Sequence, residues 1–279
     1  MTAPQVDFVT QKDVGQIQNI FPKHVRFWDI SGSIRSRTEF FQINPGKKLI
    51  ITGGMYSSGT TWTFNILRKA ALLQGSLVYG CYCENLNRSM LKKLQRYDAL
   101  ILKGHRLGKI SAEMVSNGSA KLVVPIRDPR DAICSLMKRF GHSFSGALNA
   151  VSESADNILE TQVKLPHLEL RYEDGFTADV ISVSKICTYL ELSLCASQVA
   201  LLHAELQPDQ VKKLIAKMEE TNIVNPYIPW RKFDRQTSWH INHVGDLKIG
   251  NYKHMLTRKQ RDIADQRLGP FIKYFRYDQ

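Results

Sequence analysis

The chain has 279 residues, 43% hydrophobic and 23% charged, which is ordinary for a globular enzyme and long enough for one large α/β domain. No run of about eighteen apolar residues occurs, and the first residues lack the basic-then-apolar pattern of a secretory signal, so we expect no membrane span and no secretion. The net charge of +12 favours polyanionic partners. The basic residues are spread along the chain without a Lys/Arg block, which argues against nucleic acid as the partner.

The sequence contains five cysteines, an odd number, and most of them lie in apolar runs. This usage fits buried thiols in a reduced, cytoplasmic protein. Cys81 and Cys83 suggest part of a metal motif, but no second Cys/His pair stands at zinc spacing. We therefore expect no bound metal.

Strands and helices alternate along most of the chain, after an irregular lead-in over residues 1–45. Strands are expected at 48–52, 76–81, 98–103, 121–126 and 168–172, and helices at 60–71, 87–95, after Pro129 and at 177–190. This order predicts the α/β class, with a three-layer αβα arrangement around a central, mainly parallel sheet of about 4–5 strands. A single domain is expected over 1–279, with the α/β core at 46–190 and a mostly helical part at 191–279.

The loop between the first strand and the first helix has the spacing of a phosphate-binding P-loop. Four residues separate Gly54 from Gly59, which lets the backbone wrap closely around a phosphate with its N–H groups pointing inward. Thr60 stands where nucleoside triphosphatases carry a lysine that reaches the β- and γ-phosphates. The loop is therefore expected to hold a phosphate but to be poorly equipped to transfer one.

Polar residues at the carboxyl ends of the strands are the candidate site residues, because ligands bind there in a parallel sheet. Besides the P-loop, these are Lys-Gly-His-Arg at 103–106, Arg-Asp-Pro-Arg-Asp at 127–131 and Arg-Tyr-Glu-Asp at 171–174. Arg127 and Ser135, about two helical turns apart, can grip a second phosphate. The alternative is an Arg–Asp salt bridge that caps the helix. Two phosphate-binding sites at the edge of one sheet imply a nucleotide that is phosphorylated at two places.

Together these motifs resemble those of the sulfotransferases that use 3′-phosphoadenosine 5′-phosphosulfate (PAPS). Their 5′-phosphosulfate loop is similar to Tyr56-Ser-Ser-Gly-Thr-Thr-Trp62, and their 3′-phosphate motif is similar to Arg127-Asp-Pro-Arg-Asp131 with Ser135. Their Lys-x-His element is similar to Lys103-Gly-His105, and a further family segment is similar to Arg171-Tyr-Glu-Asp174. Their Gly-Asp-Trp-Lys-Asn-x-Phe-Thr stretch is similar to Gly250-Asn-Tyr-Lys-His-Met-Leu-Thr257. The matches fall in the family's order. The resemblance implies a P-loop nucleotide-binding fold, PAPS as sulfuryl donor, adenosine 3′,5′-bisphosphate (PAP) as product, and no metal.

The resemblance also implies a role for each matching residue. The 5′-phosphosulfate would be bound by Gly59, Thr60 and Thr61, helped by backbone N–H groups of Ser57 and Ser58. The 3′-phosphate would be bound by Arg127 and Ser135, with Lys248 adding a cation and Gly250 belonging to the same C-terminal segment. Trp62 would stack on adenine, with Tyr172 nearby. The competing interpretation of Trp62 and Tyr172 is a place in the hydrophobic core.

His105 is the expected general base and Lys103 the expected catalytic cation. A hydroxyl or amine must lose a proton as it attacks sulfur, and an imidazole that titrates near neutrality suits that task. General-base action is typically worth about 10²–10⁴ in rate. The remainder would come from in-line alignment and from cations on the growing charge.

Two departures from the family pattern bear on these roles. The family loop usually has Pro-Lys, or an arginine, before Ser-Gly, whereas this chain has Tyr56-Ser57. Ser57 cannot neutralise charge, so we expect Lys103 to stabilise the departing phosphate. The family's Arg-Lys-Gly triplet is replaced by Gly245-Asp246-Leu247, which leaves the coordination of the 3′-phosphate from that side open.

The expected acceptor is a small molecule with a hydroxyl or amine. Its pocket is expected from segments around 20–45, 80–90, 141–150 and 222–243, with Glu84 among the polar residues. Two other functions stay open. A P-loop small-molecule kinase is disfavoured by Thr60 and by the lack of a clear carboxylate pair for magnesium. A catalytically impaired protein that binds PAPS or another polyanion is kept open by Ser57.

The sequence does not decide between a monomer and a homodimer. Lys253-x3-Thr257-Arg258-x3-Asp262 faintly resembles the Lys-x3-Thr-Val-x3-Glu dimer element of cytosolic sulfotransferases. Arg258 replaces the apolar residue of that element, so a homodimer through this segment is only one of the two expectations.

Overall fold

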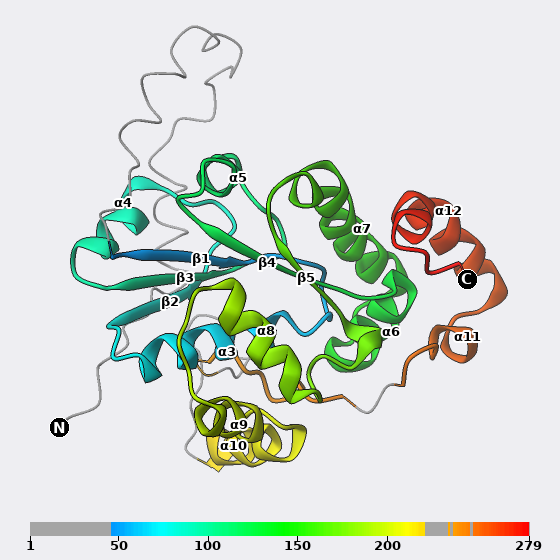
Figure 1. The fold of residues 1–279 in the computed structure, drawn as a ribbon. Helices are drawn as coiled ribbons and strands as arrows, with labels where there is room; N and C mark the ends of the chain where they lie inside the picture. The colour runs from blue at the N-terminus through cyan, green and yellow to red at the C-terminus, as the bar shows by residue number, and fades with distance from the viewer. Residues whose placement is uncertain (1–45, 221–233, 235–236, 246–247, 279) are drawn as a thin grey trace, which may run out of the picture.

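The computed structural model describes residues 46–220, 234, 237–245 and 248–278. The expected lead-in over residues 1–45 lies outside this range, so that prediction stays untested. Five strands form one sheet in the order β2-β3-β1-β4-β5 (Figure 1). They are β1 (Lys48–Thr52), β2 (Val78–Tyr82), β3 (Ala99–Lys103), β4 (Lys121–Ile126) and β5 (Leu168–Arg171). Every pairing between them is parallel. The predicted α/β class and the parallel sheet are thus confirmed.

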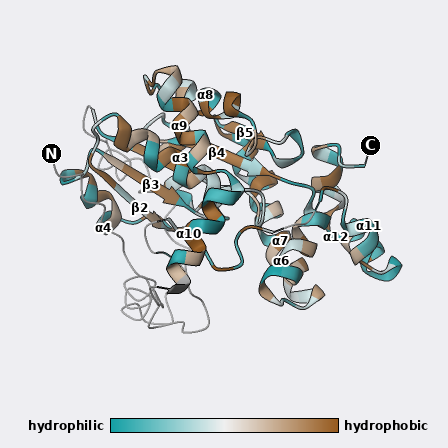
Figure 2. Cartoon of the chain, turned by 90° about the horizontal axis from the view of Figure 1, so that it is seen from below, coloured by the Kyte–Doolittle hydropathy of each residue, from teal (hydrophilic) through white to brown (hydrophobic). Residues whose placement is uncertain are grey.

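The sheet is buried on both faces because its strands are nearly continuous apolar runs, as is typical of parallel sheets. In β1, Leu49 and Ile51 point into one hydrophobic cluster and Ile50 into another on the opposite face. The strands are accordingly coloured mostly as hydrophobic in Figure 2. This alternation fixes the three-layer arrangement.

Two groups of helices supply the outer layers (Figure 1). The cluster that contains Leu49 is completed by side chains of α5 (Lys109–Ser116), α6 (Pro129–Phe140), α7 (Phe144–Glu160) and α12 (Arg258–Tyr274). The cluster that contains Ile50 is completed by α3 (Thr60–Leu73), α8 (Val180–Tyr189), α9 (Ala196–Glu205) and α10 (Pro208–Glu220). The short helix α11 (Tyr252–Met255) precedes α12. Past β5 the described residues contain helices and irregular backbone, in agreement with the predicted helical C-terminal third.

One predicted helix is divided in the structure. The stretch expected at 87–95 forms the single turn α4 (Arg88–Leu91) followed by the 3₁₀ turn η2 (Lys92–Gln95). Asn87 begins it, since its side chain accepts a hydrogen bond from the Met90 N–H over 3.0 Å. The other predicted elements lie within a few residues of those observed.

The register of the sheet brings the candidate loops to one edge. Thr52 at the end of β1 lies opposite Lys103 at the end of β3, and Ile126 at the end of β4 lies opposite Arg171 at the end of β5. The Gly104 N–H also donates to the Thr52 carbonyl over 3.0 Å. The loops that follow β1, β3 and β4 therefore leave the sheet side by side, at its carboxyl edge.

Candidate nucleotide-binding site

The P-loop crosses the end of β4 at very close range, and its first glycine permits this. Gly54 has φ +94°, and a Cβ there would lie 2.3 Å from the Pro125 carbonyl oxygen. The Met55 N–H donates to the same carbonyl over 3.1 Å. Gly59, with φ +87°, is the residue before α3. Glycine is the residue that adopts such φ values at no steric cost, so the backbone geometry accounts for the Gly-x4-Gly spacing.

Hydroxyls within the loop hold the loop together. The Ser58 Oγ lies 2.7 Å from the Met55 carbonyl oxygen and 2.9 Å from that of Pro125, and the Thr60 Oγ1 donates to Met55 over 3.2 Å. These two side chains and that of Thr61 are buried. A phosphate in this loop would therefore meet backbone N–H groups at the start of α3, where the helix dipole adds positive potential.

A buried glutamine supports the loop from the far side. Gln162, fully buried in the 3₁₀ turn η3 (Gln162–Lys164), accepts the Gly54 N–H over 3.0 Å. Its Nε2 donates to Asn157, whose Oδ1 also accepts the Leu107 N–H over 2.7 Å. This chain of contacts ties the P-loop to the loop after β3. No sequence pattern indicates this contact, because Gln162 lies more than a hundred residues from Gly54 in a short turn.

Arg127 reaches from the end of β4 to the P-loop. The residue is 3% exposed, and its guanidinium donates to the Ser57 carbonyl over 3.3 Å and lies 4.3 Å from the centre of the Tyr172 ring. Its Nε and Nη2 have no hydrogen-bond partner among the described residues. The Asp131 carboxylate is 4.0 Å away. The guanidinium thus has donors to spare for an anion.

Asp131, which pairs with Arg127 at 4.0 Å, also binds the C-terminal segment, so the competing interpretation of an Arg–Asp cap stays open. Its two oxygens accept the Gly250 N–H over 2.6 Å and the Tyr252 N–H over 2.9 Å. These bonds fasten the C-terminal segment to the first turn of α6. The helix itself is capped by Asp128, whose side chain accepts the Arg130 N–H over 2.9 Å. Gly250 consequently lies close to the Arg127 loop.

A third cation stands in the last turn of α6. Arg139 lies one helical turn beyond the buried Ser135, and its Nη1 is 3.5 Å from the Ser135 Oγ. Its Nε donates to the Asn242 carbonyl over 2.8 Å. Burial, and next to it the like charge of Arg127, lower the Arg139 pKa to about 10, against an opposing effect of Tyr172. Sequence reasoning missed Arg139.

Lys103 and His105 are both buried, at 5% and 8% exposure. Burial, and then the nearby Arg139 charge, lower the Lys103 pKa to about 7. Burial, and then the Lys103 charge, lower the His105 pKa to about 3, although backbone contacts at Gly54 and Met55 act in the opposite direction. The described residues provide no carboxylate that pairs with Lys103. The site therefore combines a buried lysine with a neutral histidine, beside the guanidiniums of Arg127 and Arg139.

Aromatic side chains enclose His105. The Tyr56 ring stacks on its imidazole with 3.8 Å between ring centres and 26° between planes. The His105 Nδ1 is buried and has no hydrogen-bond partner in the described parts of the chain. His243 also lies close enough for the charges of Arg139, Lys103 and His105 to lower its pKa, after burial as the first cause. Both imidazoles are neutral in this environment.

The remaining predicted residues lie in different settings. Trp62 is 4% exposed, meets Phe176 edge-on at 5.4 Å between ring centres, and belongs to the hydrophobic cluster on the α3 face. Its Nε1 has no hydrogen-bond partner among the described residues. Tyr172 packs partly buried against the same cluster. Lys248 is exposed. The roles of these residues in cofactor binding stay predictions.

Glu84, a predicted acceptor-pocket residue, belongs to a hydrogen-bonded network beside His105. It accepts from the Tyr82 hydroxyl over 2.7 Å and from the Arg106 Nε over 2.8 Å. The His105 backbone N–H donates over 3.4 Å to Oε1, the same Glu84 oxygen that accepts from Tyr82. The expected pocket segments at 20–45 and most of 222–243 lie outside the described residues.

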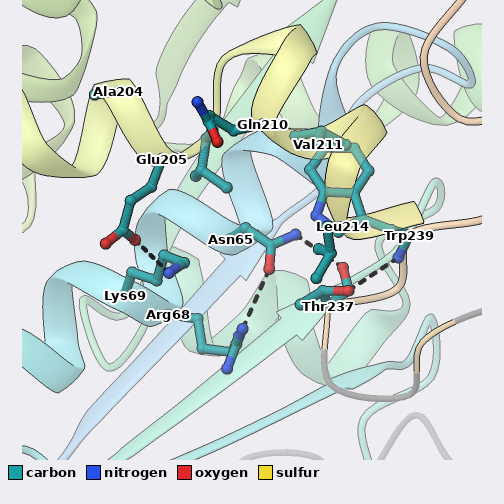
Figure 3. A pocket seen from close by; sticks show the side chains of 11 residues that line it. Asn65, Arg68, Lys69, Ala204, Glu205, Gln210, Val211, Leu214, Thr237 and Trp239 are labelled. Atoms are coloured by element: carbon teal, nitrogen blue, oxygen red, sulfur yellow. Dashed lines mark hydrogen bonds and ion pairs between the residues drawn. The ribbon is translucent and has the colours of Figure 1, made fainter. Parts of the chain in front are cut away.

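A groove in the described structure lies away from these residues. It has a volume of about 530 Å³ and runs between α3, the α9–α10 turn and residues 237–239 (Figure 3). Asn65 at its centre donates to the Thr237 carbonyl over 2.8 Å. Its lining contains none of the predicted site residues. The cationic cluster, with its unpaired donors, is the better candidate for chemistry.

Two further observations concern metal and membrane. Within the described ranges, no three His, Cys, Asp or Glu side chains gather closely enough to hold a metal ion. Of the helices that the structure describes, none has both the length and the apolar character needed to cross a membrane.

Comparisons with known proteins agree with the fold. No protein-family model matches the chain, and no curated protein matches it in sequence. Mouse sulfotransferase SULT7A1 complexed with PAP superposes with a TM-score of 0.57 and 14% identity, over 83% of this chain and 85% of that one. Retinol dehydratase, complexed with androsterone and the inactive cofactor PAP, gives a TM-score of 0.51 and 13% identity over 81% and 80%. A shikimate kinase from Bacteroides thetaiotaomicron reaches only 0.32 over 52% of this chain. The chain therefore has the P-loop fold of the sulfotransferases.

Proposed function

We propose that the protein is a PAPS-dependent sulfotransferase that moves a sulfuryl group to a hydroxyl or amine of a small-molecule acceptor. One observation carries the proposal. The buried Lys103 and Arg127 and the partly buried Arg139 lie at the carboxyl edge of the sheet, beside a P-loop that lacks the triphosphatase lysine. Several basic groups removed from water in one place favour an anionic ligand, because the ligand's charge offsets their loss of hydration.

The donors of the site suit a nucleotide with phosphates at two places. The N–H groups at the start of α3 form one anion site, and the unpartnered Nε and Nη2 of Arg127 form another. The Ser57 Oγ is also buried and has no partner among the described residues. Since Arg127 contacts the Ser57 carbonyl, the two anion sites adjoin. In this proposal the first would bind the 5′-phosphosulfate and the second the 3′-phosphate of one nucleotide.

Bound PAPS would supply a sulfuryl group attached to a phosphate that can leave. The residues of this chain would then divide the work. Lys103, at the end of β3 and opposite Thr52, would neutralise charge on the departing phosphate. Ser57 has no charge and cannot perform this task. His105 would take the proton from the attacking hydroxyl or amine. The P-loop N–H groups would hold the donor in line with the acceptor.

Burial and the Lys103 charge lower the His105 pKa because they disfavour the imidazolium. An anionic donor beside Lys103 would offset the second cause, and thus raise the His105 pKa toward the range in which a general base is effective. A neutral imidazole is the protonation state that a base needs.

The enzyme hypothesis is tested by turnover. The full chain is incubated with PAPS and a panel of phenols, alcohols and amines, and PAP formation is measured. Acceptor-dependent PAP formation that His105→Ala abolishes supports the proposal. The same panel with magnesium and ATP tests a kinase, through ADP formation.

A non-catalytic PAPS-binding protein is the second candidate, and the Tyr56–His105 stack favours it. The tyrosine ring covers one face of the imidazole, and the Nδ1 is enclosed. Tight PAP binding without PAP formation on any acceptor would support this candidate over the enzyme.

A further inference from the structure

The C-terminal segment of this chain offers no arginine toward the proposed 3′-phosphate, yet another arginine borders the same space. Gly245 occupies the first place of the triplet that is Arg-Lys-Gly in the sulfotransferases. A Cβ at Gly245 would lie 3.4 Å from the Cδ of Arg139. The aliphatic part of the Arg139 side chain therefore occupies the space into which a side chain at position 245 would extend.

The backbone directs the Arg139 guanidinium toward Ser135. Its Nε donates to the Asn242 carbonyl over 2.8 Å, and the Asn242 amide donates back to the Arg139 carbonyl over 3.1 Å. With the stem held in this way, Nη1 points along α6 and lies 3.5 Å from the Ser135 Oγ. The guanidinium is therefore fixed by neutral partners rather than by a carboxylate.

Arg127 stands at the other end of the same helix. Its charge lowers the Arg139 pKa, which places the two guanidiniums within electrostatic range of each other. In the described residues no acidic side chain makes an ion pair with Arg139, and Asp131, which pairs with Arg127 at 4.0 Å, also accepts two backbone N–H groups. A phosphomonoester dianion between the two arginines would accept hydrogen bonds from both guanidiniums and offset their like charges.

We propose that Arg139 is the second arginine of the 3′-phosphate site, where with Arg127 and Ser135 it makes the protein select nucleotides that carry a 3′-phosphate. The inference rests on the proposed function, since it assigns a residue to the same nucleotide. This assignment explains how the site can lack the Arg-Lys-Gly triplet of the C-terminal segment, because Arg139 in the last turn of α6 supplies a cation in its place.

The test compares PAP with adenosine 5′-monophosphate, which differs from it by the 3′-phosphate alone. Dissociation constants for both are measured by calorimetric titration on wild type, Arg139→Ala, Arg139→Lys and the control Arg96→Ala. Arg96 is exposed and changes the net charge by the same amount. We expect Arg139→Ala to weaken PAP binding roughly 10- to 100-fold and to leave monophosphate binding within about twofold, a change that Arg96→Ala does not reproduce.

Arg139→Lys keeps the packed aliphatic chain and a positive charge but loses the bidentate guanidinium, so we expect an intermediate loss of affinity for PAP alone. It also covers the case in which Arg139→Ala does not fold. An equal loss for both nucleotides, or an unchanged PAP affinity in both variants, would overturn the inference while leaving the proposed function intact. Absence of PAP binding by the wild type would instead overturn the proposed function, and this inference with it.

Discussion

Arg127 donates from its Nη1 to the Ser57 carbonyl over 3.3 Å, and this bond joins two motifs that lie 70 residues apart in the sequence. It fixes the P-loop against the end of β4 while two further donor atoms of the guanidinium stay unpartnered among the described residues. The two proposed phosphate sites are therefore adjacent, with Arg127 bordering both. A change at Arg127 should disturb both the ligand and the loop.

Nucleotide affinity should depend on pH through Lys103. Burial and the Arg139 charge lower its pKa to about 7, and an anionic nucleotide would favour the ammonium form. Binding at pH 8 should therefore take up a proton, and affinity should fall as the pH rises above about 7. Calorimetry in two buffers of different ionisation enthalpy measures the uptake. Lys103→Met, which keeps the length without the charge, should remove it; an unchanged uptake in this variant would refute the assignment.

Lys103 should also separate rate from affinity. If it stabilises the departing phosphate, Lys103→Ala lowers kcat far more than it raises the dissociation constant for PAPS. Steady-state kinetics beside equilibrium titration give both quantities. Equal losses in rate and affinity would mean that Lys103 only binds the donor.

His105→Gln should lower kcat by about 10²–10⁴ while PAP affinity changes little, because the base acts only in the reaction. His167→Gln is the matched control, since His167 precedes β5, at the amino end of the strand, and its Nδ1 lies 2.8 Å from the Leu165 carbonyl oxygen. A parallel loss of PAP affinity in His105→Gln would indicate a positioning role for this histidine.

The stability of the free protein should fall in mild acid. His105 has a pKa of about 3 when folded, against an ordinary value of 6.5, so the unfolded chain binds more protons between these values. Stability is therefore lost as the pH drops from about 6.5 toward 3, by up to about 1.4 kcal/mol per pH unit for this group. Urea unfolding at pH 7 and pH 5 measures the slope, which His105→Gln should reduce. A slope that this variant leaves unchanged would mean that other groups, such as His243, cause it.

Gly54→Ala should destabilise the protein by about 2–5 kcal/mol, since it adds a left-handed backbone penalty to a Cβ in contact with Pro125. Gly118→Ala is the matched control. Gly118 has φ +79° but nothing within 4 Å of a Cβ, so it should cost only about 1–2 kcal/mol. Thermal and urea unfolding of both variants isolate the close approach. Equal losses would show that the contact with β4 contributes nothing.

Much of this site could be predicted from the sequence because its parts are local. The strand, the Gly-x4-Gly spacing and the Arg127 loop each follow from neighbours in the chain, and a parallel sheet brings their ends together. Gln162 and Arg139 could not be found this way. Gln162 matters through a hydrogen bond to Gly54 across the fold, and Arg139 through its approach to Gly245 and Ser135. Such contacts depend on packing rather than on any pattern of residues.

The loop hydroxyls illustrate the same limit. Ser58 and Thr60 lie where the motif predicts them, but their side chains contact the Met55 carbonyl within the loop. Only the three-dimensional path of the backbone decides which groups of a P-loop face inward and which face a ligand. The spacing of the residues predicts the loop, whereas its donors must be seen in the structure.

The most direct test of the account is a calorimetric titration of the full chain with PAP, beside ATP with magnesium, on wild type and Arg127→Ala. We expect the wild type to bind PAP tightly, Arg127→Ala to lose roughly 10- to 100-fold in affinity, and ATP to give little response. Binding of ATP without binding of PAP would contradict the account and support a kinase.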